Sequence, residues 1–125
     1  MKILGIDTHG PVGGAALVAG GQLLSQVHLS VRATHSEQLL PTIELVLAEA
    51  MARRDGRPPV DAIAVAVGPG SFTGLRIGVV TAKSLAYAWN VPVVGVSTLE
   101  ALAYQTRRAA SLQVAMVASR REVLF

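Results

Sequence analysis

The stretch AIAVAVGPGSFTGLRIGVVTAKSLAYAW, residues 62–89, changes its hydrophobic pattern midway and so predicts a strand followed by a helix. Its first six residues are all apolar, which is typical of a buried strand. A glycine-rich loop over residues 68–74 follows, and a helix is predicted over 75–89. The same order then repeats, with a strand over 91–96 and a helix over 98–108. Because strand and helix alternate, we expect right-handed crossovers and a parallel sheet.

Three more strands are predicted before this stretch. The short apolar run KILGID, residues 2–7, ends on a polar side chain and has the pattern of a buried strand. Strands over 13–19 and 22–29 are joined by Gly20-Gly21, a glycine pair that can close a tight hairpin. Together these segments predict an antiparallel meander.

A helix over 35–54 follows the meander. Thr34 and Glu37 have the spacing of a capping box at its start, and residues 55–59 form a linker after its end. Near the end of the chain, residues 113–117 indicate a strand, and 119–125 indicate a turn that enters one more strand.

Three antiparallel strands, a helix and then alternating strands and helices are the plan of the ribonuclease H-like lobe, two of which form the actin, Hsp70 and sugar-kinase ATPases. We therefore predict an α/β fold with a mixed five- or six-stranded sheet and three helices. Residues 1–110 are expected to form this lobe. Residues 111–125 are expected to begin a second, truncated lobe.

The composition of the chain excludes several kinds of functional site and several classes of protein. The chain has 125 residues, of which 51% are hydrophobic and 15% charged, and it has no cysteine. The lack of cysteine excludes disulfides, thiolate metal sites and a cysteine nucleophile. No apolar run approaches the ~20 residues of a membrane span, and the N-terminus lacks a signal-peptide core, so we expect a cytoplasmic protein without membrane contact. The high apolar fraction indicates either a domain that is almost all core or a surface that meets another chain or a missing second half.

Positive charge gathers in arginine doublets. The formal net charge is +3, and the doublets are Arg53-Arg54, Arg107-Arg108 and Arg120-Arg121. They are compatible with a weak nucleic-acid surface. Cations in the last turn of a helix also complement its dipole. This second interpretation is favoured because no aromatic residues that could stack on bases interleave with the arginines.

Two polar loops are candidates for binding a nucleotide cofactor. Asp7 ends the first strand before a turn, where such an acid can hold Mg²⁺ in nucleotide-binding lobes; the alternative is an Asx turn. The loop 68–74 can bring its backbone and the helix N-terminus close to a phosphate; the alternative is a tight crossover that needs glycine only for its dihedral angles. It is not a Walker loop, because no Lys-Ser/Thr pair closes it. The candidate cofactor-binding residues are Asp7, Thr8, Gly68, Gly70 and Ser71.

One face of helix 75–89 is nearly bare of side chains, because Gly74, Gly78 and Ala82 recur every four residues. A bare face permits the close approach of another helix, and helix 35–54 has a wide apolar face. Either these faces meet a partner's helix pair or they pack on the chain's own sheet. For a partner interface, the predicted contact residues are Leu39, Leu40, Ile43, Leu47, Gly74, Ile77, Gly78, Thr81 and Ala82.

Catalytic groups are sparse. A ribonuclease H-type nuclease needs several carboxylates at strand ends to hold two metal ions, whereas Asp55 lies in the linker and Asp61 begins its strand. The histidines have no metal-ligand spacing, and no serine lies in a nucleophile-elbow pattern. We therefore predict no catalytic residue and no metal site.

Four motifs closely resemble the TsaB (YeaZ) family and occur in that family's order. They are ILGIDT at 3–8, HSEQLLP at 35–41, GPGSFTGLRIG at 68–78, which is highly specific, and GVSTL at 95–99. The resemblance implies a role in making threonylcarbamoyladenosine in tRNA, as a non-catalytic subunit that binds the paralogous transferase TsaD. It also implies TsaE, an ATPase, as a partner, and only indirect contact with tRNA. The family's partner surface, which also supports homodimers, corresponds to helices 35–54 and 74–89.

The resemblance also bears on metal and nucleotide binding. In TsaD the matching segment carries a metal-binding pair of histidines, and here these positions are Thr98 and Leu102, which are not strong ligands. Family members are longer than this chain, so half of a nucleotide cleft would be missing, and no cofactor is expected for this chain alone. The alternative function is an ATP-dependent phosphotransferase or ATPase of the same fold, with Asp7 for Mg²⁺ and loop 68–74 for phosphate. An older description of the family as glycoproteases finds no support in these residues.

Overall fold

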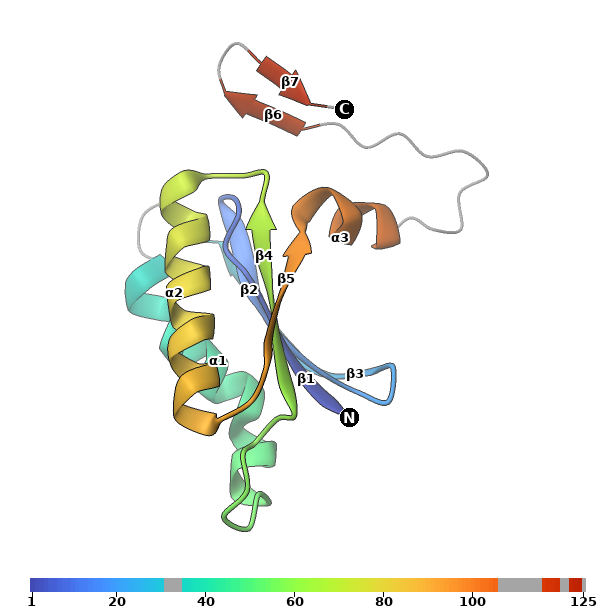
Figure 1. Ribbon diagram of the computed structural model, residues 1–125, viewed down its shortest axis with the longest axis vertical. Coiled ribbons are helices and arrows are strands. Elements are labelled where there is room, and N and C mark those ends of the chain that lie inside the picture. The colour runs from blue at the N-terminus through green and yellow to red at the C-terminus, as the bar shows by residue number, and fades with distance from the viewer. Residues whose placement is uncertain (31–34, 106–115, 120–121, 125) are drawn as a thin grey trace.

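The computed structural model describes residues 1–30, 35–105, 116–119 and 122–124. Its main element is a five-stranded sheet with the order β3-β2-β1-β4-β5 (Figure 1). The strands of this sheet are β1 (Lys2–Asp7), β2 (Val12–Ala19), β3 (Gln22–Ser30), β4 (Ala62–Gly68) and β5 (Val93–Ser97). The helices of the described residues are α1 (His35–Ala52), α2 (Phe72–Trp89) and α3 (Thr98–Gln105). The prediction of a mixed sheet with three helices is confirmed for this part of the chain.

The strand directions also follow the prediction. β1 pairs with β2, and β2 with β3, in antiparallel fashion, which is the predicted meander. β1 pairs with β4, and β4 with β5, in parallel fashion, as the alternation of strand and helix requires. Consequently the carboxyl ends of β1, β4 and β5 meet at one edge of the sheet.

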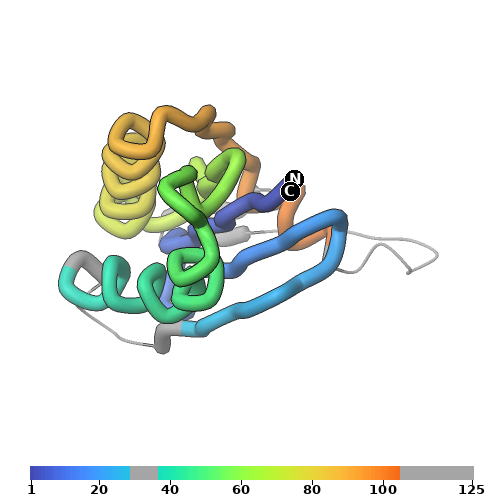
Figure 2. The backbone as a smooth tube through the Cα atoms, turned by 90° about the horizontal axis from the view of Figure 1, so that it is seen from below, coloured from blue at the N-terminus to red at the C-terminus, as the bar shows by residue number. Residues whose placement is uncertain are grey.

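The two long helices cover one face of the sheet. Figures 1 and 2 show α1 and α2 side by side on that face, whereas α3 lies on the other side, near the carboxyl ends of β4 and β5. The core fills the space between the helix pair and the sheet. It includes Leu4, Ile6, Leu17, Leu39, Ile43, Val46, Leu47, Ile63 and Val65. Each such side chain contributes about 1.5–3 kcal/mol when it is removed from water.

The opposite face of the sheet is less covered. Small residues there, including Gly5, Ala16, Ala64 and Ala66, leave a hollow of about 400 Å³, and Ala101 of α3 lies at its edge. In the part of the chain that the structure describes, no helix has the length and hydropathy that a membrane span needs.

Several element boundaries differ from the prediction by one to three residues, and hydrogen bonds at the two ends of α2 explain two of these differences. α2 begins at Phe72 and not at residue 75, because Ser71 caps it and accepts a hydrogen bond of 3.3 Å on its hydroxyl from the Gly74 N–H. β5 begins at Val93 and not at residue 91, because the Val91 N–H still donates to the Ala86 carbonyl at the end of α2 and Pro92 has no N–H. α1 ends at Ala52 and not at residue 54.

Residues near the C-terminus form a separate pair of strands. β6 (Met116–Ser119) and β7 (Glu122–Leu124) are antiparallel to each other, and β7 matches the strand predicted at the end of the chain. Several predictions lie outside the described residues: the cap at Thr34, the helix end over 106–108, the strand residues 113–115, and the doublets Arg107-Arg108 and Arg120-Arg121. The division into lobes at residue 110 stays a prediction.

Candidate functional site

The glycine-rich loop and the turn after β1 lie together at the carboxyl edge of the sheet. The Ser71 N–H donates to the His9 carbonyl oxygen at 2.8 Å. A Cβ atom at Gly70 would lie 2.7 Å from the Cβ atom of His9, so this close approach requires glycine. The structure therefore brings the five predicted cofactor-binding residues to one edge: Asp7, Thr8, Gly68, Gly70 and Ser71.

Thr8 joins this turn to α2. Its side chain is buried, and its Oγ1 donates a hydrogen bond of 2.5 Å to the Gly74 carbonyl oxygen. A Cβ atom at Gly74 would overlap the Thr8 carbonyl oxygen, and a Cβ atom at Gly78 would overlap Thr8 Oγ1. The bare face of α2 therefore packs against the chain itself, since the glycines let the helix approach Thr8, directly after β1.

Asp7 forms an Asx turn. Its Oδ1 accepts a hydrogen bond of 3.0 Å from the His9 N–H and lies 2.6 Å from His9 Nδ1. Among the described residues, no group of three or more His, Cys, Asp or Glu side chains could hold a metal ion. The contacts of Asp7 in this structure are therefore those of a turn-forming residue.

Two N–H groups of the glycine-rich loop are bonded within the chain. The Ser71 N–H is bonded to His9, and the Gly74 N–H is bonded to the Ser71 hydroxyl. His9 also fills the space above Gly70. We call the contacts among Thr8, His9, Ser71 and Gly74 the clamp, because they hold the start of α2 against the end of β1.

Six of the nine predicted partner contacts lie inside the fold. They are Leu39, Ile43, Leu47, Gly74, Gly78 and Ala82. These residues are covered by the chain itself. Leu40 is exposed, and Ile77 and Thr81 are half-buried. A partner on these helices would therefore meet their outer faces, rather than the apolar faces that the periodicity marks.

Large apolar side chains also lie on those outer faces. Leu45 of α1 and Val80 and Tyr87 of α2 are all exposed. We define the outer helix surface as the exposed or half-buried residues Leu40, Leu45, Ile77, Val80, Thr81 and Tyr87, of which Leu40 and Leu45 lie about 140° apart around α1. Sequence reasoning missed three of these residues because it followed the strongest apolar stripe of each helix, which faces the sheet. The available signal was an apolar residue on the side of the helix away from that stripe.

The start of α3 contains Thr98 and Leu102, the positions at which the resemblance predicts the histidines of TsaD. Thr98 is buried, and its Oγ1 has no hydrogen-bond partner among the described residues. Leu102 is half-buried, and the N–H of the exposed Glu100 donates to the Ser97 hydroxyl at 3.4 Å. A hydroxyl and an alkyl side chain cannot replace two imidazole ligands.

Comparison with protein families and curated proteins gives consistent matches. The family model described as TsaD, tRNA N6-adenosine threonylcarbamoyltransferase, matches residues 23–124. The tRNA threonylcarbamoyladenosine biosynthesis protein TsaB of Bacillus subtilis is 38% identical over 86% of this chain and 45% of its own length. The protein of that name from Haemophilus influenzae is 34% identical over 100% of this chain and 52% of its own length. The chain spans about half the length of these relatives.

Solved structures show the same relationship. YeaZ from Pseudomonas aeruginosa superposes with a TM-score of 0.82 at 34% identity, over 98% of this chain and 57% of that chain. RuvC from Thermus thermophilus superposes with a TM-score of 0.52 at 18% identity, which is a likeness of fold alone. The predicted ribonuclease H-like fold is confirmed.

Proposed function

The chain belongs to the TsaB (YeaZ) family, and from this premise we propose that it is a subunit of the machinery that makes threonylcarbamoyladenosine in tRNA. In this role it is a non-catalytic scaffold that binds the paralogous transferase TsaD. The observation that carries the proposal is the outer helix surface, which lies on the two helices where the resemblance predicts the partner. TsaE as a further partner and a cytoplasmic location belong to the same proposal.

The outer helix surface has the chemistry of a protein-binding surface. Removing apolar area from water contributes about 25 cal/mol per Å², and Leu40, Leu45 and Val80 are all exposed. Tyr87 adds an exposed aromatic ring, a residue type that is enriched among binding hot spots. Because α1 and α2 lie side by side in both views (Figures 1 and 2), one helix pair of a partner can cover residues from both.

The non-catalytic role is supported by the residues at the positions where a metal ion or a nucleotide would be bound. Thr98 and Leu102 stand where the resemblance places the metal ligands of TsaD, and neither is a strong ligand. Asp7 is engaged in an Asx turn with His9. The transfer chemistry is therefore assigned to the partner.

Val80→Asp is expected to weaken binding of TsaD by roughly 30-fold or more, because a buried carboxylate without a partner costs at least about 2 kcal/mol at an interface. Val80 is 55% exposed in the free chain, so the substitution should leave the fold intact. Isothermal titration calorimetry with TsaD gives the affinity.

A matched control is available on β3. Leu24 is 54% exposed and lies outside the outer helix surface, so Leu24→Asp is expected to leave TsaD binding unchanged. Equal binding by the Val80→Asp variant and the unsubstituted chain would contradict the proposed surface, as would no binding by the unsubstituted chain. If the free chain forms dimers that Val80→Asp disrupts, a second copy occupies the same surface.

The chain alone is expected to bind no Mg-ATP, because Asp7 is engaged by His9 and the N–H groups of Ser71 and Gly74 are bonded within the chain. Titration calorimetry with ATP, with and without Mg²⁺, measures this. Magnesium-dependent heat that is lost in Asp7→Asn would contradict the prediction and favour the ATPase alternative.

A further inference from the structure

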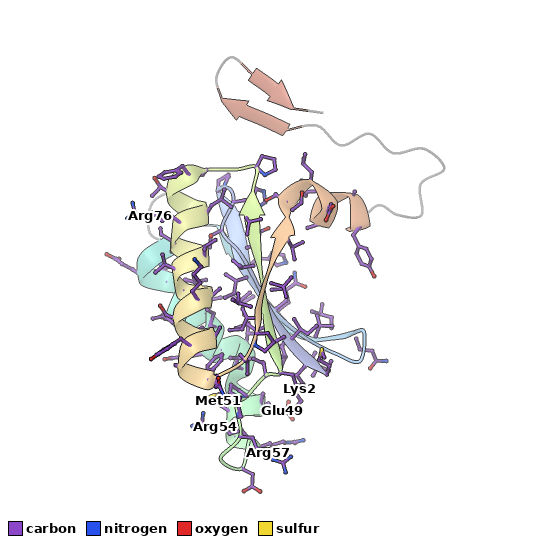
Figure 3. All side chains as sticks on the ribbon, viewed as in Figure 1. Lys2, Glu49, Met51, Arg54, Arg57 and Arg76 are labelled. Atoms are coloured by element: carbon purple, nitrogen blue, oxygen red, sulfur yellow. The ribbon has the colours of Figure 1, made fainter. Side chains whose placement is uncertain are left out.

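A hollow whose lining includes four cationic and two acidic side chains lies at the end of the molecule opposite the glycine-rich loop. It has a volume of about 490 Å³ and is lined by the start of β1, the end of α1 and the linker before β4. Figure 3 shows Lys2, Arg54 and Arg57 together at this end. With Arg53, these residues form what we call the basic end, and all four are exposed.

The backbone holds two of these arginines close together. The Arg57 N–H donates to the Arg54 carbonyl oxygen at 2.9 Å, which closes a four-residue turn. The central residues Asp55 and Gly56 have φ angles of 53° and 80°, as a type I′ turn requires. Such a turn keeps its first and last Cα atoms within about 7 Å of each other. The side chains of Arg54 and Arg57 therefore leave the backbone from neighbouring points.

Three of the four cations are not neutralised by ion pairs. Within residues 1–30, 35–105, 116–119 and 122–124, Arg53 forms an ion pair with Glu49 at 2.9 Å, and no ion pair includes Lys2, Arg54 or Arg57. The other carboxylates at the hollow are those of Asp55 and Asp61, and Asp61 accepts a hydrogen bond of 2.7 Å from the Lys2 backbone N–H.

Compensation of the helix dipole accounts for only part of this cluster. Arg53 and Arg54 lie at the carboxyl end of α1, where cations are favoured. Arg57 follows the turn, and Lys2 belongs to β1, so the dipole of α1 does not account for their position. Exposed guanidinium groups at close spacing suit successive phosphates of an extended polyanion, since arginine can bind a phosphate with two hydrogen bonds.

We propose that the basic end binds the phosphate backbone of RNA. Resting on the proposed function, the RNA is the tRNA on which the machinery acts, so the chain contacts tRNA directly and not only through its partner. The aromatic side chains needed for base stacking are not among the residues that line the hollow. Binding is therefore expected to depend on salt and to be nearly independent of base sequence.

The test measures binding of an unmodified tRNA transcript to the full chain by fluorescence anisotropy at several salt concentrations. In Arg54→Gln/Arg57→Gln, the slope of log affinity against log salt is expected to fall by about 2, about 1 for each cation removed. Affinity at low salt is expected to fall by roughly tenfold or more. Arg76→Gln/Lys83→Gln removes the same charge from α2 and is expected to bind the tRNA like the unsubstituted chain.

Two further measurements separate charge from folding. Arg54→Lys/Arg57→Lys keeps the charge and is expected to retain most of the salt-dependent binding. Thermal unfolding of all variants shows whether the substitutions act on the end of α1. Unchanged tRNA binding in Arg54→Gln/Arg57→Gln would overturn the proposal, whether or not its melting temperature falls. Binding of the unsubstituted chain to anionic lipid vesicles and not to tRNA would also overturn it.

The same variants separate this proposal from the proposed function. Arg54→Gln/Arg57→Gln is expected to bind TsaD normally, because the basic end lies outside the outer helix surface. If the unsubstituted chain fails to bind TsaD but binds tRNA through Arg54 and Arg57, the scaffold role fails and the RNA site stands. If it binds TsaD and this complex gains no affinity for tRNA from Arg54 and Arg57, the RNA site fails and the scaffold role stands.

Discussion

Gly78→Ala is expected to destabilise the fold by about 2 kcal/mol, although alanine favours a helix over glycine by about 1 kcal/mol. The added methyl group would overlap Thr8 Oγ1. This hydroxyl cannot turn away without losing its buried hydrogen bond to the Gly74 carbonyl oxygen. Urea denaturation followed by circular dichroism measures the loss. It is a large fraction of the 5–15 kcal/mol that stabilises a typical domain.

Thr8→Ala should remove the destabilisation that Gly78→Ala causes. In a Thr8→Ala background the obstructing hydroxyl is absent, and the nearest Val65 atom is at an ordinary contact distance of 3.6 Å. Gly78→Ala is then expected to be neutral or to stabilise the fold by up to about 1 kcal/mol. An equal loss of stability in both backgrounds would contradict the packing described here.

Gly74 and Gly10 provide two controls for the substitution at Gly78. Gly74→Ala is expected to destabilise the fold in both backgrounds, because its methyl group would meet the main-chain oxygen of Thr8, which Thr8→Ala does not remove. Gly10→Ala places a methyl group where no atom lies within 4 Å and should change stability little. The clash, rather than the loss of a glycine, would then explain the effect at Gly78.

Leu39→Ala is expected to lower the free energy of unfolding by about 2–5 kcal/mol, because Leu39 is 1% exposed and its truncation leaves a cavity in the core. For a domain of this size each kcal/mol shifts the melting temperature by several degrees, on the order of 4 °C. Thermal unfolding by calorimetry therefore detects the change easily.

The next residue on the same helix is the control. Leu40 is 49% exposed, so Leu40→Ala is expected to change stability by no more than about 0.5 kcal/mol and to reduce TsaD binding instead. Similar losses of stability in the two variants would contradict the assignment of Leu39 to the core and Leu40 to the outer helix surface.

Much of the fold could be predicted because apolar periodicity reports directly which side of an element is buried. In KILGID, Leu4 and Ile6 alternate with less buried residues, and the structure places both in the core. The boundaries were less accurate where a cap sets them. Ser71 starts α2 three residues early, whereas the end of α2 at Trp89, before Asn90 in the left-handed conformation with φ 54°, agrees with the prediction.

The candidate sites were predicted less completely. The turn at Asp7 and the loop at Gly68 were predicted as two separate candidate segments, and parallel pairing of β1 and β4 brings them to one edge of the sheet. The alternatives to cofactor binding were an Asx turn and a tight crossover. The bonds from Ser71 to His9 and from Thr8 to Gly74 were not predicted, because they join residues far apart in the sequence. Arg57 lies in the predicted linker, and its proximity to Lys2 is likewise a product of folding.

The order of strands and helices, the ribonuclease H-like plan and the family can be inferred from the amino-acid sequence, because they depend on local periodicity and on continuous motifs. What each apolar face contacts becomes known from the folded molecule. A stripe such as Gly74, Gly78 and Ala82 has the same composition whether a partner or the chain's own sheet covers it. The overlap of a Cβ atom at Gly78 with Thr8, 70 residues earlier in the chain, distinguishes the two, and that overlap exists only in the folded molecule.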